Sequence, residues 1–148
     1  MKVKIKRIDA ELPLPKYETA GAAGFDFLAR EDKAVQPKEI VLVPGNIIVE
    51  IPEGYMLVVV SRSSGPKKKG VQLPHGIGVI DSDYRGPEDE IWIQLYNFTD
   101  QAVTIKRGEK IAQGILIPVV QAEWDEIDQV ASPSRGGGGS TGGYYENP

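Results

Sequence analysis

The sequence contains no cysteine and one histidine, His75, among its 148 residues. The absence of cysteine excludes disulfide bonds, thiolate nucleophiles and zinc sites built on cysteine. With a single histidine, Ser-His pairs and histidine-rich metal sites are missing as well. Any catalysis must therefore use carboxylates, hydroxyls, amides and cations, with or without a hard metal ion held by oxygen.

Long apolar runs and an excess of positive charge are also absent. No segment approaches the ~18 uncharged apolar residues of a membrane span. Residues 1–6 alternate lysine with apolar residues and lack the apolar block of a signal peptide. We therefore expect a soluble, cytoplasmic protein with no membrane partner. The formal net charge of -4 argues against stable nucleic-acid binding, which normally accompanies a basic balance.

The residues that are present indicate one all-β domain. Seventeen glycines and eleven prolines favour frequent turns over long helices. β-branched runs between Pro-Gly and Glu-Gly turns predict an antiparallel sandwich or barrel, with strands over residues 2–8, 25–29, 39–45, 47–52, 55–60, 90–98, 103–105 and 111–118. Residues 121–130 are expected to form an edge strand or a connector. The expected strand over residues 90–98 carries three aromatic side chains on one face, namely Trp92, Tyr96 and Phe98. We expect this face to lie in the core.

The segment from Gly76 to Gly86 is the most suggestive for function. Its apolar strand residues Val79 and Ile80 are expected to bury one face and to fix the direction of Asp81. Asp81 and Tyr84 then place a carboxylate and an aromatic ring together at a strand end, and glycines let the backbone approach a ligand closely. This segment could hold a small polar molecule, although an ordinary solvated turn has the same composition.

Three other segments carry charged groups. Residues 61–70 combine hydroxyls, backbone N–H groups and cations after a buried strand, which suits phosphate, although a solvated basic loop is the alternative. Asp26 lies between two phenylalanines, and the strand pattern alone predicts that it faces water. Beyond residue 130 the sequence becomes glycine-rich, so we expect a domain over residues 1–130 and a flexible arm over 131–148. Arg135 gives the arm a cation for polyphosphate.

In order along the chain, five segments resemble the five motifs of the trimeric dUTP pyrophosphatases (dUTPases). They are residues 23–27 (AGFDF), 62–65 (RSSG), 78–86 (GVIDSDYRG), 107–113 (RGEKIAQ) and 135–142 (RGGGGSTG). The resemblance implies an all-β, distorted jelly-roll-like β-barrel that assembles as a homotrimer. It also implies sites at subunit interfaces, an arm that closes over a neighbouring subunit's site, and Mg²⁺-dependent hydrolysis of dUTP to dUMP and pyrophosphate.

The resemblance also implies a role for each site residue. Asp81 corresponds to the carboxylate that activates water for attack on the α-phosphorus, and Tyr84 to the ring that packs on deoxyribose and excludes a 2′-hydroxyl. The backbone of the hairpin over residues 73–80 reads uracil, and its contributors include His75, Val79 and Ile80.

Polyphosphate contacts follow from the same resemblance. Arg62, Ser63 and Ser64 correspond to the phosphate cradle, Gln113 to a contact with phosphate and water, and Arg135 to the γ-phosphate ligand of the arm. Asp26 corresponds to an acid near the water shell of the metal.

Departures from the family pattern leave alternatives open. Ser64 replaces a glycine, and His75 stands where some members have asparagine. The fifth segment lacks the usual Phe-Gly pair directly before Ser140, so Tyr144 or Tyr145 could cover uracil instead. A dCTP deaminase shares the Arg-Ser-Ser segment, but its catalytic glutamate is replaced here by Gln94, whose neutral amide cannot transfer protons. A noncatalytic nucleotide-binding module is the third reading, and the presence of Asp81 and Arg135 argues against it.

Overall fold

The computed structural model describes residues 1–137. Within this part of the chain the structure is almost entirely β, as the β-branched runs predicted. Its strands are β1 (Lys4–Arg7), β2 (Phe25–Leu28), β3 (Lys33–Val35), β4 (Ile40–Pro44), β5 (Ile47–Glu50), β6 (Tyr55–Ser61), β7 (Val71–Gln72), β8 (Ile77–Ile80), β9 (Trp92–Asn97), β10 (Val103–Ile105) and β11 (Lys110–Pro118), and its helix is α1 (Ser64–Lys69).

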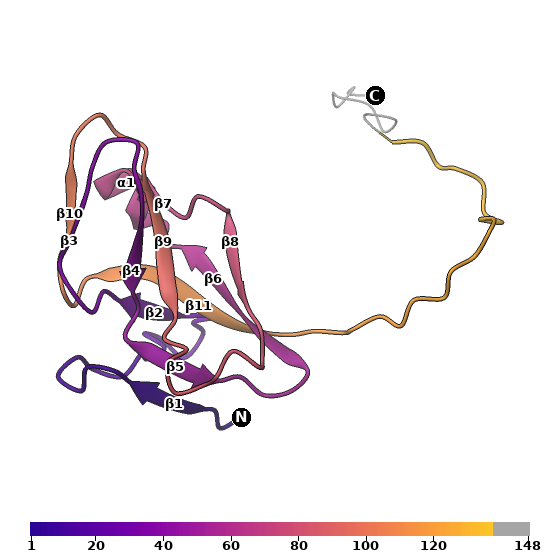
Figure 1. Cartoon of the computed structure of the whole chain (residues 1–148), viewed down its shortest axis with the longest axis horizontal. Coiled ribbons are helices and arrows are strands. Elements are labelled where there is room, and N and C mark those ends of the chain that lie inside the picture. The colour runs from indigo at the N-terminus through magenta and orange to yellow at the C-terminus, as the bar shows by residue number, and fades with distance from the viewer. Residues whose placement is uncertain (138–148) are drawn as a thin grey trace.

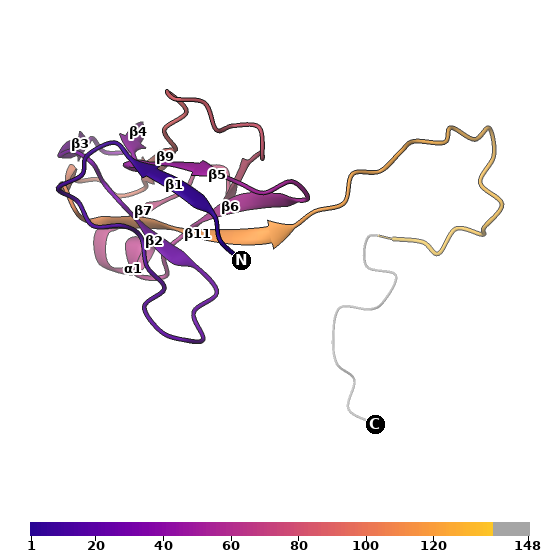
Figure 2. The same cartoon turned by 90° about the horizontal axis from the view of Figure 1, so that it is seen from below.

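Antiparallel pairing organises these strands into four sheets (Figures 1 and 2). The largest has the order β2-β11-β6-β8, and a second has the order β4-β9-β7; the pairs β1-β5 and β10-β3 complete the set. Together they form an all-β fold, as the strand pattern predicted, and its jelly-roll-like type is the one that the family resemblance implied. Closure of these sheets into a barrel stays a prediction.

The hydrophobic core is shared by the two larger sheets. Both contribute to one buried cluster that includes Phe27, Leu57, Val59, Val43, Ile93 and Leu95. The buried face of β9 is therefore the one that carries the aliphatic side chains. The prediction that Trp92, Tyr96 and Phe98 lie in the core is wrong. Trp92 and Phe98 are 46% and 37% exposed, and Tyr96 is half-buried and not part of the core cluster.

Other differences from the sequence-based expectations are local. Residues 64–69, expected as a loop, form helix α1, which ends where Gly70 adopts a left-handed φ of 68°. The short strand β3 was not predicted. Residues 120–137 are exposed and contain no strand, so residues 121–130 are a connector and not an edge strand. Figure 1 shows this connector leaving the body after β11. The predicted division at residue 130 stays untested.

No helix within the described residues is long and apolar enough to cross a membrane.

A buried ion pair ties the end of β2 to the segment before β9. Glu90 is 6% exposed, and its carboxylate accepts hydrogen bonds from Arg30 Nε at 2.9 Å and Arg30 Nη2 at 3.0 Å. The hydrogen bonds that the Arg30 guanidinium donates to Glu90 raise the pKa of Arg30. The backbone N–H of Asn46 also donates to this carboxylate, at 2.9 Å.

Replacing Arg30 with methionine is expected to destabilise the fold by about 3 kcal/mol, because the Glu90 carboxylate would stay buried without its counter-charge. Urea unfolding at a fixed protein concentration measures this loss. Arg107→Met is the matched control, since Arg107 pairs with Asp9 and Glu11 at an exposed site. Equal losses in the two variants would contradict the assignment of Arg30 and Glu90 as a core anchor.

Candidate functional site

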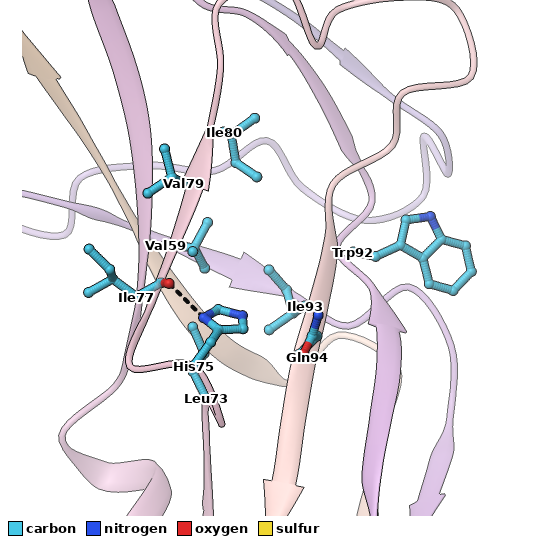
Figure 3. A pocket seen from close by; sticks show the side chains of 10 residues that line it. Val59, Leu73, His75, Ile77, Val79, Ile80, Trp92, Ile93 and Gln94 are labelled. Atoms are coloured by element: carbon cyan, nitrogen blue, oxygen red, sulfur yellow. Dashed lines mark hydrogen bonds between the residues drawn. The ribbon is translucent and has the colours of Figure 1, made fainter. Parts of the chain in front are cut away.

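A cavity of about 280 Å³ lies between the hairpin that ends in β8 and strand β9. From the hairpin it is lined by Leu73, His75 and residues 77–80, and from β9 by residues 92–94. Figure 3 shows the His75 ring in the space between the hairpin and β9. The predicted residues His75, Val79 and Ile80 are therefore brought together at one concave site.

The shape of this hairpin depends on its glycines. Gly76 has a φ of 75°, which a side chain would strain, and His75 Nδ1 donates to the Ile77 carbonyl oxygen at 2.6 Å. A Cβ at Gly78 would lie 3.2 Å from Cβ of Val59, so glycine lets β8 lie close to β6. The backbone of the hairpin is thereby held at the edge of the cavity.

Asp81 follows β8 directly and is exposed. Its carbonyl oxygen accepts a hydrogen bond from the backbone N–H of Tyr84 at 3.2 Å, so the two predicted residues share one turn. Tyr84 is 40% exposed, and its hydroxyl donates to the carbonyl oxygen of Glu90 at 3.2 Å. An exposed carboxylate and a partly exposed ring therefore follow directly after β8, the strand that lines the cavity.

A second cavity, of about 400 Å³, contains the predicted phosphate cradle. Arg62, Ser63 and Ser64 line it at the start of α1, opposite Lys110 and its neighbours on β11. Arg62 Nη1 donates to the carbonyl oxygen of Lys110 at 3.2 Å. Hydroxyls and cations therefore converge here, which suits an anionic ligand.

Asp26 lies beside this cavity, and the expectation that it faces water is wrong. It is 7% exposed, because Arg62 Nε and Lys110 Nζ each lie 2.9 Å from one of its carboxylate oxygens. The Arg62 contact is an ion pair by distance only, since the buried Oδ1 accepts no hydrogen bond from the described residues. Such an orphan acceptor is typically satisfied by water.

Lys110 is a site residue that the sequence analysis did not single out. Its ammonium contacts Glu18 at 2.6 Å as well as Asp26. The hydrogen bonds that it donates to Glu18 and, to a smaller extent, to Asp26 raise the pKa of Lys110. The hydrogen bond from Lys110 lowers the pKa of Glu18. In the sequence, only its place in the fourth segment, three residues before Gln113, pointed to Lys110 as a site residue. Its carboxylate partners, Glu18 and Asp26, lie far away in the sequence.

The remaining predicted residues divide into two groups. Gln113 pairs with Asp26 across β2 and β11, so both side chains project from the same face of the sheet. Arg135 is exposed, five residues beyond the end of the connector. The rest of the fifth segment, residues 138–142, lies outside the described residues, as do Tyr144 and Tyr145.

Gln94 and Trp92 are further residues at the first cavity that were not predicted to bind ligand. Figure 3 shows the Trp92 ring directed away from the β8 hairpin. Among residues 1–137, no three His, Cys, Asp or Glu side chains are grouped as a metal site.

Within one chain the two cavities are separate. Asp81 follows Ile80, which pairs with Leu57 on β6, whereas Arg62 lies five residues beyond Leu57 along the chain. Continuing this register puts Asp81 opposite Met56, six residues from Arg62. At ~3.3 Å per residue, the two backbone positions therefore lie about 20 Å apart along the strand direction. Asp81 and Arg62 of one chain are therefore too far apart to contact adjacent phosphates of one ligand.

Comparisons with known proteins agree on one family. The dUTPase family model matches residues 10–142. Deoxyuridine 5'-triphosphate nucleotidohydrolase from Nautilia profundicola is 42% identical over 144 residues, spanning 96% of this chain and 99% of the relative. The structure of dUTPase from Streptococcus mutans has a TM-score of 0.75 and 36% sequence identity, covering 81% of this chain and 98% of that one.

A Staphylococcus bacteriophage 80alpha dUTPase with dUPNHPP has a TM-score of 0.84 and covers 95% of this chain and 98% of its own. At 23% identity, this similarity supports the fold alone.

Proposed function

Because the chain belongs to the dUTPase family and is a dUTP diphosphatase, we propose that Asp81 activates the water that attacks the α-phosphorus of dUTP. The carboxylate accepts a proton from water as the new P–O bond forms, and the bond to pyrophosphate breaks in line with the attack. One observation carries this assignment: Asp81 is an exposed carboxylate immediately after the strand that lines the first cavity.

The first cavity is the proposed uracil slot. Backbone N–H and C=O groups of a rigid hairpin can pair with uracil and would face like groups on cytosine. His75, Val79 and Ile80 contribute mainly through that backbone. The Tyr84 ring would pack against deoxyribose, where a ribose 2′-hydroxyl would collide with it.

The second cavity is the proposed polyphosphate cradle. Arg62 donates charge-assisted hydrogen bonds to the leaving pyrophosphate as its negative charge grows, and Ser63 and Ser64 add hydroxyl donors. Gln113 is placed on the same sheet face as Asp26, where its amide can contact phosphate or water.

Magnesium enters the proposal as part of the substrate, held chiefly by triphosphate oxygens, whose charge it would partly neutralise. Asp26 fits this arrangement only through water, because both of its carboxylate oxygens already lie 2.9 Å from cationic nitrogens. Its orphan Oδ1 is the atom that would accept a hydrogen bond from such a water.

A homotrimer would bring the separated halves of the site together, with the β8 hairpin of one subunit facing the cradle of another. Exposed apolar side chains on the outer sheet faces support such an interface. On β8 these are Ile77 and Val79, each 53% exposed, and on β4 and β9 they are Ile40, Leu42 and Trp92 at 56%, 50% and 46%. We place the enzyme in the cytoplasm.

The arm over residues 131–148 completes the proposed site. Arg135 would bind the γ-phosphate when the arm closes over a neighbouring subunit. The connector before it is exposed and contains no strand or helix over residues 121–130, which leaves its backbone free to reach another chain.

Pyrophosphate release from dUTP, with Mg²⁺ present and with dCTP, dTTP and UTP as controls, tests the function. We expect turnover of dUTP alone. Ammonia release from dCTP would instead support a deaminase, whose proton-transferring glutamate is replaced here by Gln94. Tight dUTP binding without turnover would indicate a noncatalytic module.

A further inference from the structure

Between Asp81 and Glu90 the chain forms neither strand nor helix, although both ends of this segment have defined hydrogen bonds. We propose that the turn over residues 86–90, with the Arg30–Glu90 ion pair beneath it, positions the Tyr84 ring and so sets discrimination against ribonucleotides. The inference rests on the role of Tyr84 in the proposed function and adds Asp89, Glu90 and Arg30 as positioning residues.

Tyr84 is held at two points. Its backbone N–H donates to the Asp81 carbonyl oxygen at 3.2 Å, and its hydroxyl donates to the Glu90 carbonyl oxygen at the same distance. The ring spans the gap between these bonds while 40% of the residue stays exposed. One face of the ring can therefore meet a sugar, but the ring cannot swing aside unless the hydroxyl loses its partner.

The position of the Glu90 carbonyl is set by the turn that precedes it. The Asp89 carboxylate accepts a hydrogen bond from the Gly86 N–H at 2.6 Å, and the Asp89 N–H donates to the Gly86 carbonyl oxygen at 3.2 Å. A Cβ at Gly86 would come within 2.9 Å of that carboxylate, so glycine lets Asp89 close the turn. This closure fixes the distance from Tyr84 to Glu90.

The Glu90 side chain anchors the turn to the core. Two bonds from Arg30, at the end of β2, and one from the N–H of Asn46, before β5, hold its buried carboxylate. The next residue, Ile91, is bonded to Ile47 through its N–H and to Gly45 through its carbonyl oxygen. The acceptor for the Tyr84 hydroxyl is therefore attached to the rigid core and not to a free loop.

The test is the ratio of kcat/KM for dUTP to kcat/KM for UTP. Tyr84→Phe keeps the ring and removes the hydroxyl donor, whereas Asp89→Ala removes the carboxylate that closes the turn. Each should lower the ratio about fivefold, as expected for one lost hydrogen bond of ordinary strength, mainly through faster use of UTP. Glu88→Ala is the matched control, because this neighbouring acid is exposed and its side chain makes no hydrogen bond within residues 1–137.

Tyr84→Ala separates this inference from the function on which it rests, and thermal unfolding confirms that each variant folds. If Tyr84→Ala lowers the ratio but Tyr84→Phe and Asp89→Ala match the wild type, the positioning role is wrong and the ring still selects the sugar. If Tyr84→Ala also leaves the ratio unchanged, the assignment of Tyr84 itself fails. If Glu88→Ala lowers the dUTP/UTP ratio as much as Asp89→Ala does, the proposal is wrong as well, because the loss would then reflect the removed negative charge and not the turn.

Discussion

Replacing Asp81 with asparagine is expected to lower kcat for dUTP hydrolysis by about 10³-fold. General-base catalysis contributes about 10²–10⁴-fold in enzymes, and an amide of the same shape cannot accept the proton of the attacking water. Because Asp81 is exposed and its carbonyl bond to Tyr84 uses the backbone, the substitution should disturb neither the turn nor the fold. Single-turnover rates of pyrophosphate release measure the effect on chemistry.

Substrate binding separates loss of chemistry from loss of the site. The Asp81→Asn variant should bind a nonhydrolysable dUTP analogue with a dissociation constant within a few-fold of wild type. Glu88→Gln, an exposed acid in the same segment, is the control and should keep full kcat. Rates near normal in Asp81→Asn would remove the proposed base from the mechanism.

Arg62→Met is expected to lower kcat/KM for dUTP by about 10²-fold, the typical loss when one donor to developing negative charge is removed. Arg62 is suited to this task because its guanidinium is held by Asp26 and by the Lys110 carbonyl oxygen. Asp26 would keep its Lys110 partner at 2.9 Å, so the buried acid stays compensated and the fold should survive. Steady-state kinetics across dUTP concentrations give the loss.

Arg7→Met controls for the removal of any partly buried arginine. Arg7 Nη1 donates to the backbone carbonyl oxygens of Ala10 and Leu12, but it lines neither proposed cavity. The kcat/KM of the Arg7→Met variant for dUTP should match that of the wild type. Equal activity in Arg62→Met and Arg7→Met would contradict the assignment of Arg62 to the cradle.

Most strands could be predicted from the sequence because β-branched runs alternate with turns. Which face of β9 is buried could not be predicted, because both faces of this strand carry apolar side chains. Burying Trp92 and Phe98 would remove more apolar area per residue from water than burying aliphatic side chains. The structure nevertheless buries Ile91, Ile93 and Leu95. Helix α1 was hidden by Gly65 and Pro66, both poor helix formers.

The candidate residues were identified from ordered motifs, whereas their environments depend on contacts distant in sequence. Asp26 reads as a water-facing residue of an alternating strand until Arg62 and Lys110 cover its carboxylate. Likewise, nothing local indicates that Asp81 and Arg62 stand near opposite ends of β6. That separation follows only from the register of β8 on β6.

A subunit-mixing experiment tests most directly whether each site combines Asp81 of one subunit with Arg62 of another. Asp81→Asn and Arg62→Met chains, each strongly impaired alone, are unfolded together, refolded in equal amounts and checked for mixed trimers by native mass spectrometry. Random assortment around a closed ring gives about a quarter of the sites both intact residues, so we expect about a quarter of wild-type activity. Mixed trimers no more active than their parents would contradict the shared site.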